Sequence, residues 1–276
     1  MRMPLAAADR VLRWGLLALC VAVLGFLILP VLAVIPLSFN AGSFLTYPLA
    51  GFSARWYLDF FTSPRWLPAL SNSVFIGAFA TVIATVLGTA AALGLDRMGG
   101  LPRQVLSALF LMPVVVPVVV IGSSLYGLFA ALGLTASYIG LILAHALLGA
   151  PFVVITVTAT LSGFDRGLLR AALSLGATPI EAFRRVTLPL ILPGIVSGAI
   201  FAFATSFDEI VVTLFLASPQ QRTLPLQMFD GVREQISPTI TAAATLLFLI
   251  SMLLVGVVEL LRRRTERLRI PGSTVT

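Results

Sequence analysis

Long apolar stretches separated by short polar segments make up most of this chain. A bilayer core about 30 Å thick is crossed by roughly 20 apolar residues in a helix. Six stretches reach that length, approximately Trp14–Leu37, Leu70–Leu95, Val105–Leu132, Tyr138–Leu161, Gly194–Leu216 and Ile240–Leu261. The pattern therefore predicts an all-α membrane protein with six transmembrane helices.

The first stretch follows two arginines, Arg10 and Arg13, as a secretory signal would. Its apolar run is longer than the roughly 7–15 residues of a signal peptide's apolar region. We therefore expect an uncleaved membrane anchor.

Composition agrees with a membrane protein and excludes several chemistries. Hydrophobic residues make up 59% of the chain and charged residues 11%, whereas a soluble domain is about 25% charged. All 18 basic residues are arginine. Without lysine the chain has neither a Walker A loop nor a lysine Schiff base, so we expect no bound ATP and no cofactor.

The arginines are spread along the chain, which argues against nucleic-acid binding. The single cysteine, Cys20, forms no intrachain disulfide.

The distribution of arginine predicts the orientation in the membrane. With six spans, both termini lie on one side. Fourteen arginines fall on that side and four on the other. The positive-inside rule then places both termini in the cytoplasm. Residues 38–69 become an external loop, and its Trp56, Tyr57 and Trp66 suggest a short segment at the membrane interface.

Prolines interrupt two of the expected spans. Pro113 and Pro117 lie four residues apart in the third, and Pro151 lies in the fourth. Each proline removes a backbone hydrogen bond, so the freed carbonyl needs another partner within the protein. Small residues recur in the second and fifth spans, at Gly88 and Gly198 among others, and allow helices to approach closely.

The polar segment between the fourth and fifth spans predicts two short helices. Asp165 is a suitable N-cap for a first helix, Arg166–Leu175, which has an apolar stripe. Gly176 follows in the position where a left-handed backbone is needed. Thr178-Pro179-Ile180-Glu181 is a capping box that begins a second helix of about two turns, and we expect Leu188-Pro189 to end the hairpin. Helices this short require a surface to pack on, either their own membrane domain or a partner.

This segment resembles the EAA motif of the permease subunits of bacterial ABC importers. The match comprises Ala171-Ala172, three residues, Gly176, nine residues, Val186, one residue and Leu188-Pro189. The family's glutamate is replaced by Arg170 and its isoleucine by Val186. The resemblance implies a type I importer permease fold in which this hairpin docks into a separate cytoplasmic ATPase subunit. It implies ATPase-coupling roles for the following residues: Asp165, Arg170, Ala171, Ala172, Gly176, Thr178, Glu181, Leu188 and Pro189.

The resemblance extends over roughly residues 67–258. It includes "NSV" at 72–74, "SFDEIVVTLFL" at 206–216 and "TLPLQMFDGVREQISPTITA" at 223–242, which are similar to spermidine/putrescine permeases of the second-subunit type. It divides the chain into an anchor helix and external loop (1–66), a transmembrane domain (67–258) and a basic cytoplasmic tail (259–276). It implies a bacterial inner-membrane protein, not itself an enzyme, that contacts membrane lipid and works with a second permease in a heterodimer, two ATPase subunits and a periplasmic or extracellular binding protein.

Two acids occur in the fifth predicted span. Asp208 and Glu209 lie 14 and 15 residues after Gly194, which is about 21 Å along a helix. A carboxylate in the membrane costs on the order of 2–3 kcal/mol, so it should face a cavity or a partner. One interpretation is a path or gate for a cationic solute such as a polyamine. The other is a structural ion pair, a contact with a helix end, or a position at the interface.

The chain has a single histidine, His145, in the fourth span. We expect a neutral imidazole bonded to a neighbouring helix, with a proton relay as the alternative. An intramembrane protease using His145 and Ser197 is a competing function. A permease for another solute (amino-acid-like, an opine or a metal ion) and a secondary transporter or channel are others.

Overall fold

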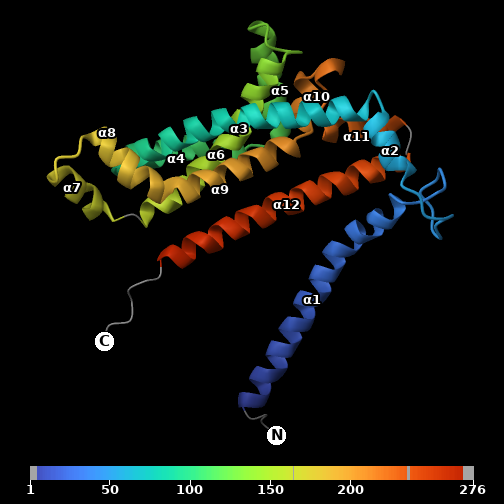
Figure 1. Cartoon of the computed structure of the whole chain (residues 1–276), viewed down its shortest axis with the longest axis horizontal. Coiled ribbons are helices and arrows are strands. Elements are labelled where there is room, and N and C mark those ends of the chain that lie inside the picture. Colours follow the sequence, from blue (N-terminus) through green and yellow to red (C-terminus); the bar gives the residue numbers. More distant parts are fainter. Residues whose placement is uncertain (1–4, 164, 235–236, 270–276) are drawn as a thin grey trace. The chain divides into compact units, whose positions relative to one another are not determined.

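A computed structural model describes residues 5–163, 165–234 and 237–269, and this part of the chain is helical throughout apart from its loops (Figure 1). The long helices are α1 (Leu5–Leu37), α3 (Trp66–Arg97), α4 (Gly100–Val115), α5 (Val118–Ala131), α6 (Tyr138–Ser162), α9 (Leu188–Phe207), α11 (Leu224–Glu234) and α12 (Pro238–Arg269). The short ones are α2 (Arg55–Thr62), α7 (Arg166–Ser174), α8 (Pro179–Ala182) and α10 (Val211–Leu216). The chain forms two compact units, Met1–Ser63 with Gly231–Phe248, and Pro64–Asp230 with Leu249–Thr276.

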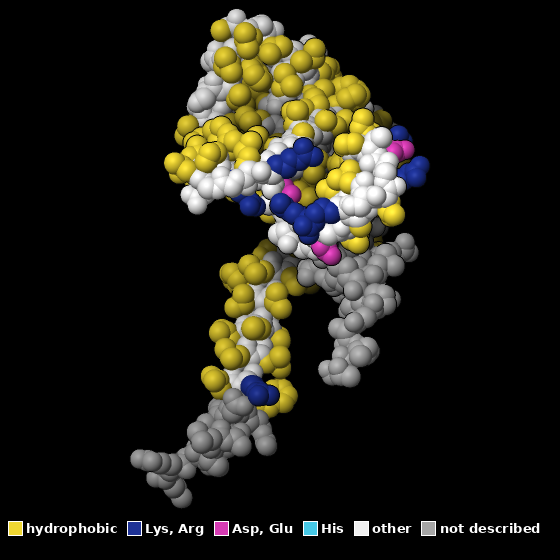
Figure 2. Space-filling view, turned by 90° about the vertical axis from the view of Figure 1, so that its left-hand side faces the viewer, with side chains coloured by type: hydrophobic (Ala, Val, Ile, Leu, Met, Phe, Trp, Pro, Cys, Tyr) yellow, Lys and Arg dark blue, Asp and Glu magenta, His cyan; other side chains and the backbone are white. Residues whose placement is uncertain are grey.

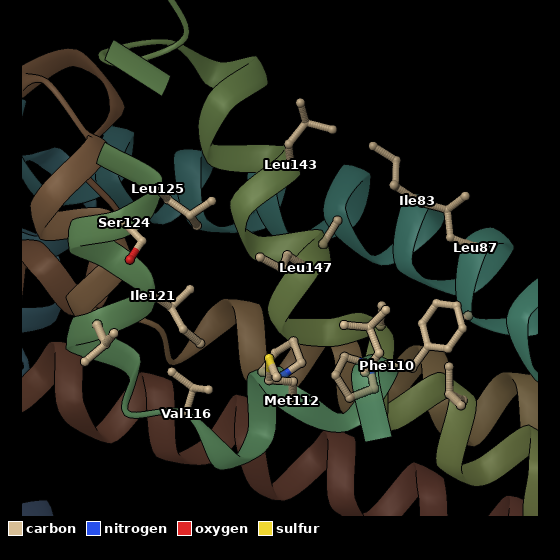
Figure 3. Close-up of a pocket in the computed structure, with 18 residues that line it drawn as sticks. Ile83, Leu87, Phe110, Met112, Val116, Ile121, Ser124, Leu125, Leu143 and Leu147 are labelled. Atoms are coloured by element: carbon tan, nitrogen blue, oxygen red, sulfur yellow. The ribbon is translucent and has the colours of Figure 1, made fainter. Parts of the chain in front are cut away.

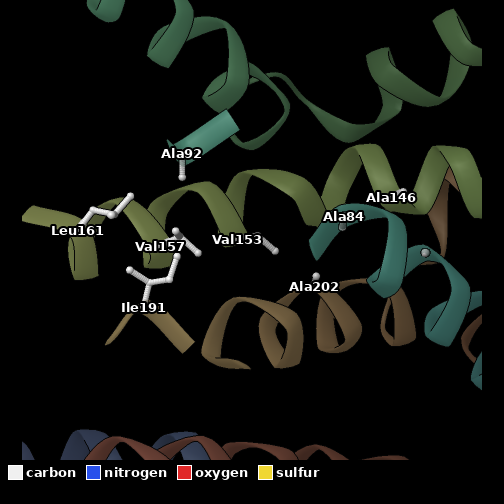
Figure 4. Packing of buried hydrophobic residues seen from close by; sticks show 9 residues of the cluster. Ala84, Ala92, Ala146, Val153, Val157, Leu161, Ile191 and Ala202 are labelled. Atoms are coloured by element: carbon white, nitrogen blue, oxygen red, sulfur yellow. The ribbon is translucent and has the colours of Figure 1, made fainter. Parts of the chain in front are cut away.

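The centre of the second unit is the packing of α3, α6 and α9 against one another. Small side chains on α3 make this possible: Ala80, Ala84 and Ala92 recur at helical spacing, and all are buried. They pack with Val153 and Val157 of α6 (Figure 4). Small residues at such spacing let helix backbones approach closely, which is the main source of attraction between helices in lipid.

Val153 of α6 lies between two glycines of its neighbours. A Cβ added to Gly88 of α3 would lie 2.7 Å from the Cβ of Val153, and one added to Gly198 of α9 would lie 2.7 Å from its Cα. Real Cβ atoms do not come this close to other heavy atoms. The expected role of these glycines in close helix approach is thus confirmed.

Two predicted spans are not continuous helices. The third is broken at Val116-Pro117 into α4 and α5, which meet at an angle of 101°. The break falls directly before Pro117, where Val116 has the extended backbone (φ −72°, ψ 133°) that a following proline favours. Pro113, by contrast, stays inside α4. By length and composition, five helices in the described part can cross a membrane, and six spans result if α4 and α5 count together.

The fifth predicted span, Gly194–Leu216, also differs from expectation. Its helix α9 begins earlier, at Leu188, and ends at Phe207, and α10 resumes at Val211. Residues 208–210, which include both acids, form a break between the two helices. The sequence pattern did not predict this break, because an apolar run of this length is consistent with one continuous helix.

The first unit contains α1, residues 38–63 of the predicted external loop, and α2. In this loop the indole N–H of Trp56 donates to the carbonyl of Asn40 (2.7 Å), and the hydroxyls of Ser38 and Tyr57 are bonded at 2.7 Å. Asp59 of α2 accepts a hydrogen bond from the hydroxyl of Thr239 (2.7 Å). The short helix α2 includes Trp56 and Tyr57, whereas Trp66 is the buried first residue of α3. The location of α2 at a membrane interface stays a prediction.

Candidate functional site

The hairpin between α6 and α9 begins with a capped helix. The carboxylate of Asp165 accepts a hydrogen bond from the backbone N–H of Gly167 (2.7 Å), so Asp165 is the N-cap of α7 as predicted. Helix α7 ends at Ser174, one residue earlier than expected. Gly176 then has φ +88°, a left-handed conformation that favours glycine.

The turn after α7 is a Schellman motif. The N–H of Gly176 bonds to the carbonyl of Leu173 (3.0 Å), and that of Ala177 bonds to the carbonyl of Ala172 (3.1 Å). This pair of bonds satisfies carbonyls at the helix end and fixes the direction in which the chain leaves it. The motif glycine at 176 and the alanine at 172 are thus both used in the bend of the hairpin.

The second helix of the hairpin begins with the predicted capping box. The hydroxyl of Thr178 accepts from the N–H of Glu181 (3.3 Å), and the Glu181 carboxylate accepts from the N–H of Thr178 (2.9 Å). At the predicted end of the hairpin, Leu188-Pro189, helix α9 begins, but without a break in the chain of helical residues. Helix α8 continues through a π-helical turn, Phe183–Thr187, directly into α9. Pro189 lies just after this wider turn, as the second residue of α9.

The hairpin is polar, and it also exposes apolar side chains. Leu175 is 88% exposed and Ile180 is 71% exposed. Arg170 and Ala171 are exposed as well, whereas Ala172 and Leu188 are half-buried. Arginine side chains gather around this end of the unit in Figure 2. Apolar groups surrounded by arginines are typical of a protein-docking surface.

An ion pair that the sequence did not predict joins the hairpin to α3. The guanidinium of Arg166 lies 3.1 Å from the carboxylate of Asp96, and it also donates to the Asp96 backbone carbonyl (3.0 Å). Asp96 is next to the last residue of α3. No local pattern could have found this contact, because the two residues are 70 positions apart.

The two acids lie in the break between α9 and α10 and differ in their surroundings. The Glu209 carboxylate accepts from the backbone N–H of Val212 (2.7 Å), so it caps the first turn of α10. A contact with a helix end was one of the predicted structural roles, and Glu209 has it. Asp208 is exposed, and within the described residues its carboxylate has no hydrogen-bond or ion-pair partner.

His145 is buried, with 1% of its surface exposed. Its Nδ1 lies 2.7 Å from the hydroxyl of Ser206 in α9, and its Nε2 lies 3.1 Å from the hydroxyl of Thr213 in α10. The expectation of a histidine bonded to a neighbouring helix is confirmed. Ser197, its partner in the protease hypothesis, is not among the residues to which it is bonded.

An apolar cavity of about 650 Å³ lies where α3, α4, α5 and α6 meet around the α4–α5 break (Figure 3). Phe110, Ile121, Leu125 and Leu147 are among its lining residues, and Ser124 supplies the one side-chain polar group. Neither acid lines it. A charged ammonium would lose its hydration here without compensation, so this cavity does not suit a cationic solute.

The segment after α10 is tied to the starts of α3 and α6. The amide of Asn72 donates to the carbonyls of Gln220 (2.9 Å) and Arg222 (3.0 Å), and the Tyr138 hydroxyl donates to the carbonyl oxygen of the Asn72 side chain (2.9 Å). Ser73 accepts from the N–H of Leu224 (2.7 Å). Sequence reasoning noted "NSV" at 72–74 only as part of a resemblance, and these bonds give it a structural role.

Together these features define the membrane subunit of a transporter: a bundle with broken spans, unpaired charge in one break, and an exposed helical hairpin at the other end of α9. Residues 84–267 match the family described as "Binding-protein-dependent transport system inner membrane component". This match covers more than half of the chain, and the chain therefore belongs to that family of ABC importer permeases.

Two of the similar proteins are polyamine permeases, and a third is a probable molybdenum permease. The chain is 33% identical over 245 residues to the spermidine/putrescine transport system permease protein PotC of Haemophilus influenzae, covering 88% of this chain and 95% of that one. It is 35% identical over 229 residues to the putrescine transport system permease protein PotI of Escherichia coli K12, covering 80% and 81%. A probable molybdenum ABC transporter permease of Haloferax volcanii is 36% identical over 199 residues, covering 69% and 71%.

Solved structures support the fold. A bacterial ABC transporter involved in alginate import has a TM-score of 0.69 at 15% identity, covering 95% of this chain and 96% of that chain. An amino acid ABC transporter with histidines has a TM-score of 0.56 at 21% identity, covering 73% and 94%. The predicted type I importer permease fold is confirmed. Since such permeases are not catalytic and ATP hydrolysis occurs in a separate subunit, the chain is not an enzyme.

Family membership also decides between the functions that the sequence left open. The chain is a multi-pass protein of the inner membrane and works with partner proteins. The secondary transporter, the channel and the intramembrane protease are thereby excluded as functions.

Other expectations stay predictions. These are the ATPase-coupling and solute-path roles of individual residues, and the domain boundaries at 66/67 and 258/259. The side chains of the basic tail from 261 onward, and residues 270–276 entirely, lie outside the described part.

Proposed function

We propose that this permease passes a polyamine, such as spermidine or putrescine, along a path that includes Asp208. This proposal rests mainly on one observation, the unpaired, exposed carboxylate of Asp208 at the break between α9 and α10. A polyamine carries several ammonium groups that need compensation where water is scarce. The names of the relatives from Haemophilus influenzae and Escherichia coli support the same solute class.

The proposed complex has a second permease, two ATPase subunits and an external binding protein. The hairpin α7–α8 would dock on one ATPase, and ATP would bind there and not to this chain. A solved relative in complex with a periplasmic protein supports an external partner in this fold. The arginine distribution supports cytoplasmic termini, which puts the hairpin on the ATPase side.

The mechanism that we propose depends on α9. This helix begins directly after the hairpin and ends at the acidic break. Its 20 residues span about 30 Å at 1.5 Å per residue. Closure of the ATPases would move the hairpin, and a rigid α9 would carry that motion to the break and change the access of solute to Asp208.

The Haloferax volcanii relative favours a second candidate solute, an oxyanion such as molybdate. An unpaired carboxylate in the path argues against it, because like charges repel. One assay distinguishes the two candidates. Uptake of spermidine and uptake of molybdate are each measured with the reconstituted transporter and its own binding protein, and the two rates are compared.

The direct test is uptake by the Asp208→Asn variant in proteoliposomes that contain the complete transporter. We expect the maximal rate of spermidine uptake to fall by at least about tenfold, the ratio for one lost hydrogen bond to a charged group. Asp230→Asn is the control, since Asp230 is paired with Arg222 (3.2 Å). Unchanged uptake in Asp208→Asn would contradict the proposed path.

A further inference from the structure

The lone histidine, His145, contacts both sides of the acidic break. Ser206, bonded to Nδ1, is in the last turn of α9, and Thr213, bonded to Nε2, is in α10. One side chain on α6 thus holds the end of one helix and the start of the next. Residues 208–210 lie between these two attachment points.

Each ring nitrogen of His145 bonds one hydroxyl, Nδ1 that of Ser206 (2.7 Å) and Nε2 that of Thr213 (3.1 Å), and a hydroxyl can either donate or accept. A neutral imidazole has one donor and one acceptor, which are both used in this arrangement.

Helix α10 depends on such attachments. It has six residues, too few for a stable helix in isolation. The Glu209 cap supports its first turn, and the close contact of Gly122 in α5 with Phe215 supports its outer face. The two bonds to His145 fix α10 relative to α9, and the relative direction of these helices decides where the Asp208 carboxylate points.

We propose that His145 is a positioning residue, which holds the two ends of the break so that Asp208 faces the path of the solute. This inference rests on the proposed function, because it assigns His145 a role toward the same carboxylate. It predicts that either bond, when removed alone, changes the exposure of position 208 without unfolding the protein.

The test measures the position of residue 208 and not transport. In a Cys20→Ser background, an Asp208→Cys variant of the complete transporter is labelled with a cationic methanethiosulfonate reagent. Ser206→Ala and Thr213→Val each remove one hydroxyl bond, and His145→Leu removes both. We expect Ser206→Ala and Thr213→Val each to change the labelling rate by about threefold to fivefold, as one hydrogen bond would, and His145→Leu to change it more, because both bonds are lost. His145→Gln, whose amide also has a donor and an acceptor, should restore a rate near that of the parent.

Thr158→Val is the matched control. Thr158 is on the same helix, and its buried hydroxyl has no partner within the described residues. An unchanged rate in both Thr213→Val and His145→Leu would overturn the proposal, as would an equal change in Thr158→Val. Failure of the proposed function is distinguished by uptake in Asp208→Asn with His145 intact, because that assay is independent of the labelling rate.

Discussion

The guanidinium of Arg166 lies 3.1 Å from the carboxylate of Asp96 and joins the start of the hairpin to the end of α3. The chain already joins the hairpin to α6 and α9, and this pair links it to α3, the third helix of the central packing. A displacement of the hairpin is therefore also transmitted to α3.

Breaking this pair should impair coupling more than stability. The Arg166 side chain is 65% exposed, so we expect Asp96→Asn or Arg166→Ala to cost less than about 1 kcal/mol of stability. The coupling ratio, which is the number of solute molecules transported per ATP hydrolysed, should nevertheless fall. The double variant Arg166→Asp with Asp96→Arg, in which the two charges are exchanged, should recover part of the lost coupling ratio. Single variants that keep the parent ratio would contradict this role.

The contact of α9 with α6 leaves no room for a methyl group at Gly198. We expect Gly198→Ala to cost about 1–3 kcal/mol, because the added Cβ would overlap the backbone of Val153. A lower thermal unfolding midpoint in detergent would show it. Gly94→Ala on α3 is the control: its Cβ would have nothing within 4 Å, so its effect should be neutral or favourable by up to ~1 kcal/mol. Equal midpoints for the two variants would refute the packing argument.

The bend of the hairpin depends on the left-handed backbone at Gly176. Gly176→Ala should cost roughly 1–2 kcal/mol of local stability and loosen the hairpin. Faster hydrogen exchange in residues 166–187 would report this, together with weaker retention of the ATPase subunits during purification. Gly176→Asn should be milder, since asparagine tolerates this conformation better. The idea fails if alanine and asparagine behave alike and both match the parent.

Arg170 occupies the position where the family motif has glutamate. We expect the partner ATPase to present an acidic or polar surface to it. Arg170→Glu should then weaken ATPase binding by at least about tenfold through like-charge repulsion, and Arg170→Gln should have a smaller effect. Binding constants measured with the transporter's own ATPase would decide this, and tighter binding of Arg170→Glu would contradict it.

Features that depend on neighbouring residues were predictable from the sequence. The apolar runs predicted the spans, because the length of a helix across lipid is set by the bilayer. Asp165, Gly176 and the Thr178–Glu181 capping box were predictable because caps and left-handed turns depend on residues within a few positions. The spacing of the EAA motif was sufficient to identify the family.

Features that depend on contacts between distant segments needed the tertiary structure. Hydropathy does not distinguish a straight apolar run from one broken at Pro117 or at residues 208–210. Glu209 and Asp208 are adjacent acids, and only the fold shows that one caps a helix and the other stands unpaired. The bonds of His145 to Ser206 and Thr213 span 61 and 68 residues. The sequence determined what each segment can form, and the packing of α3, α6 and α9 decided which side chains meet.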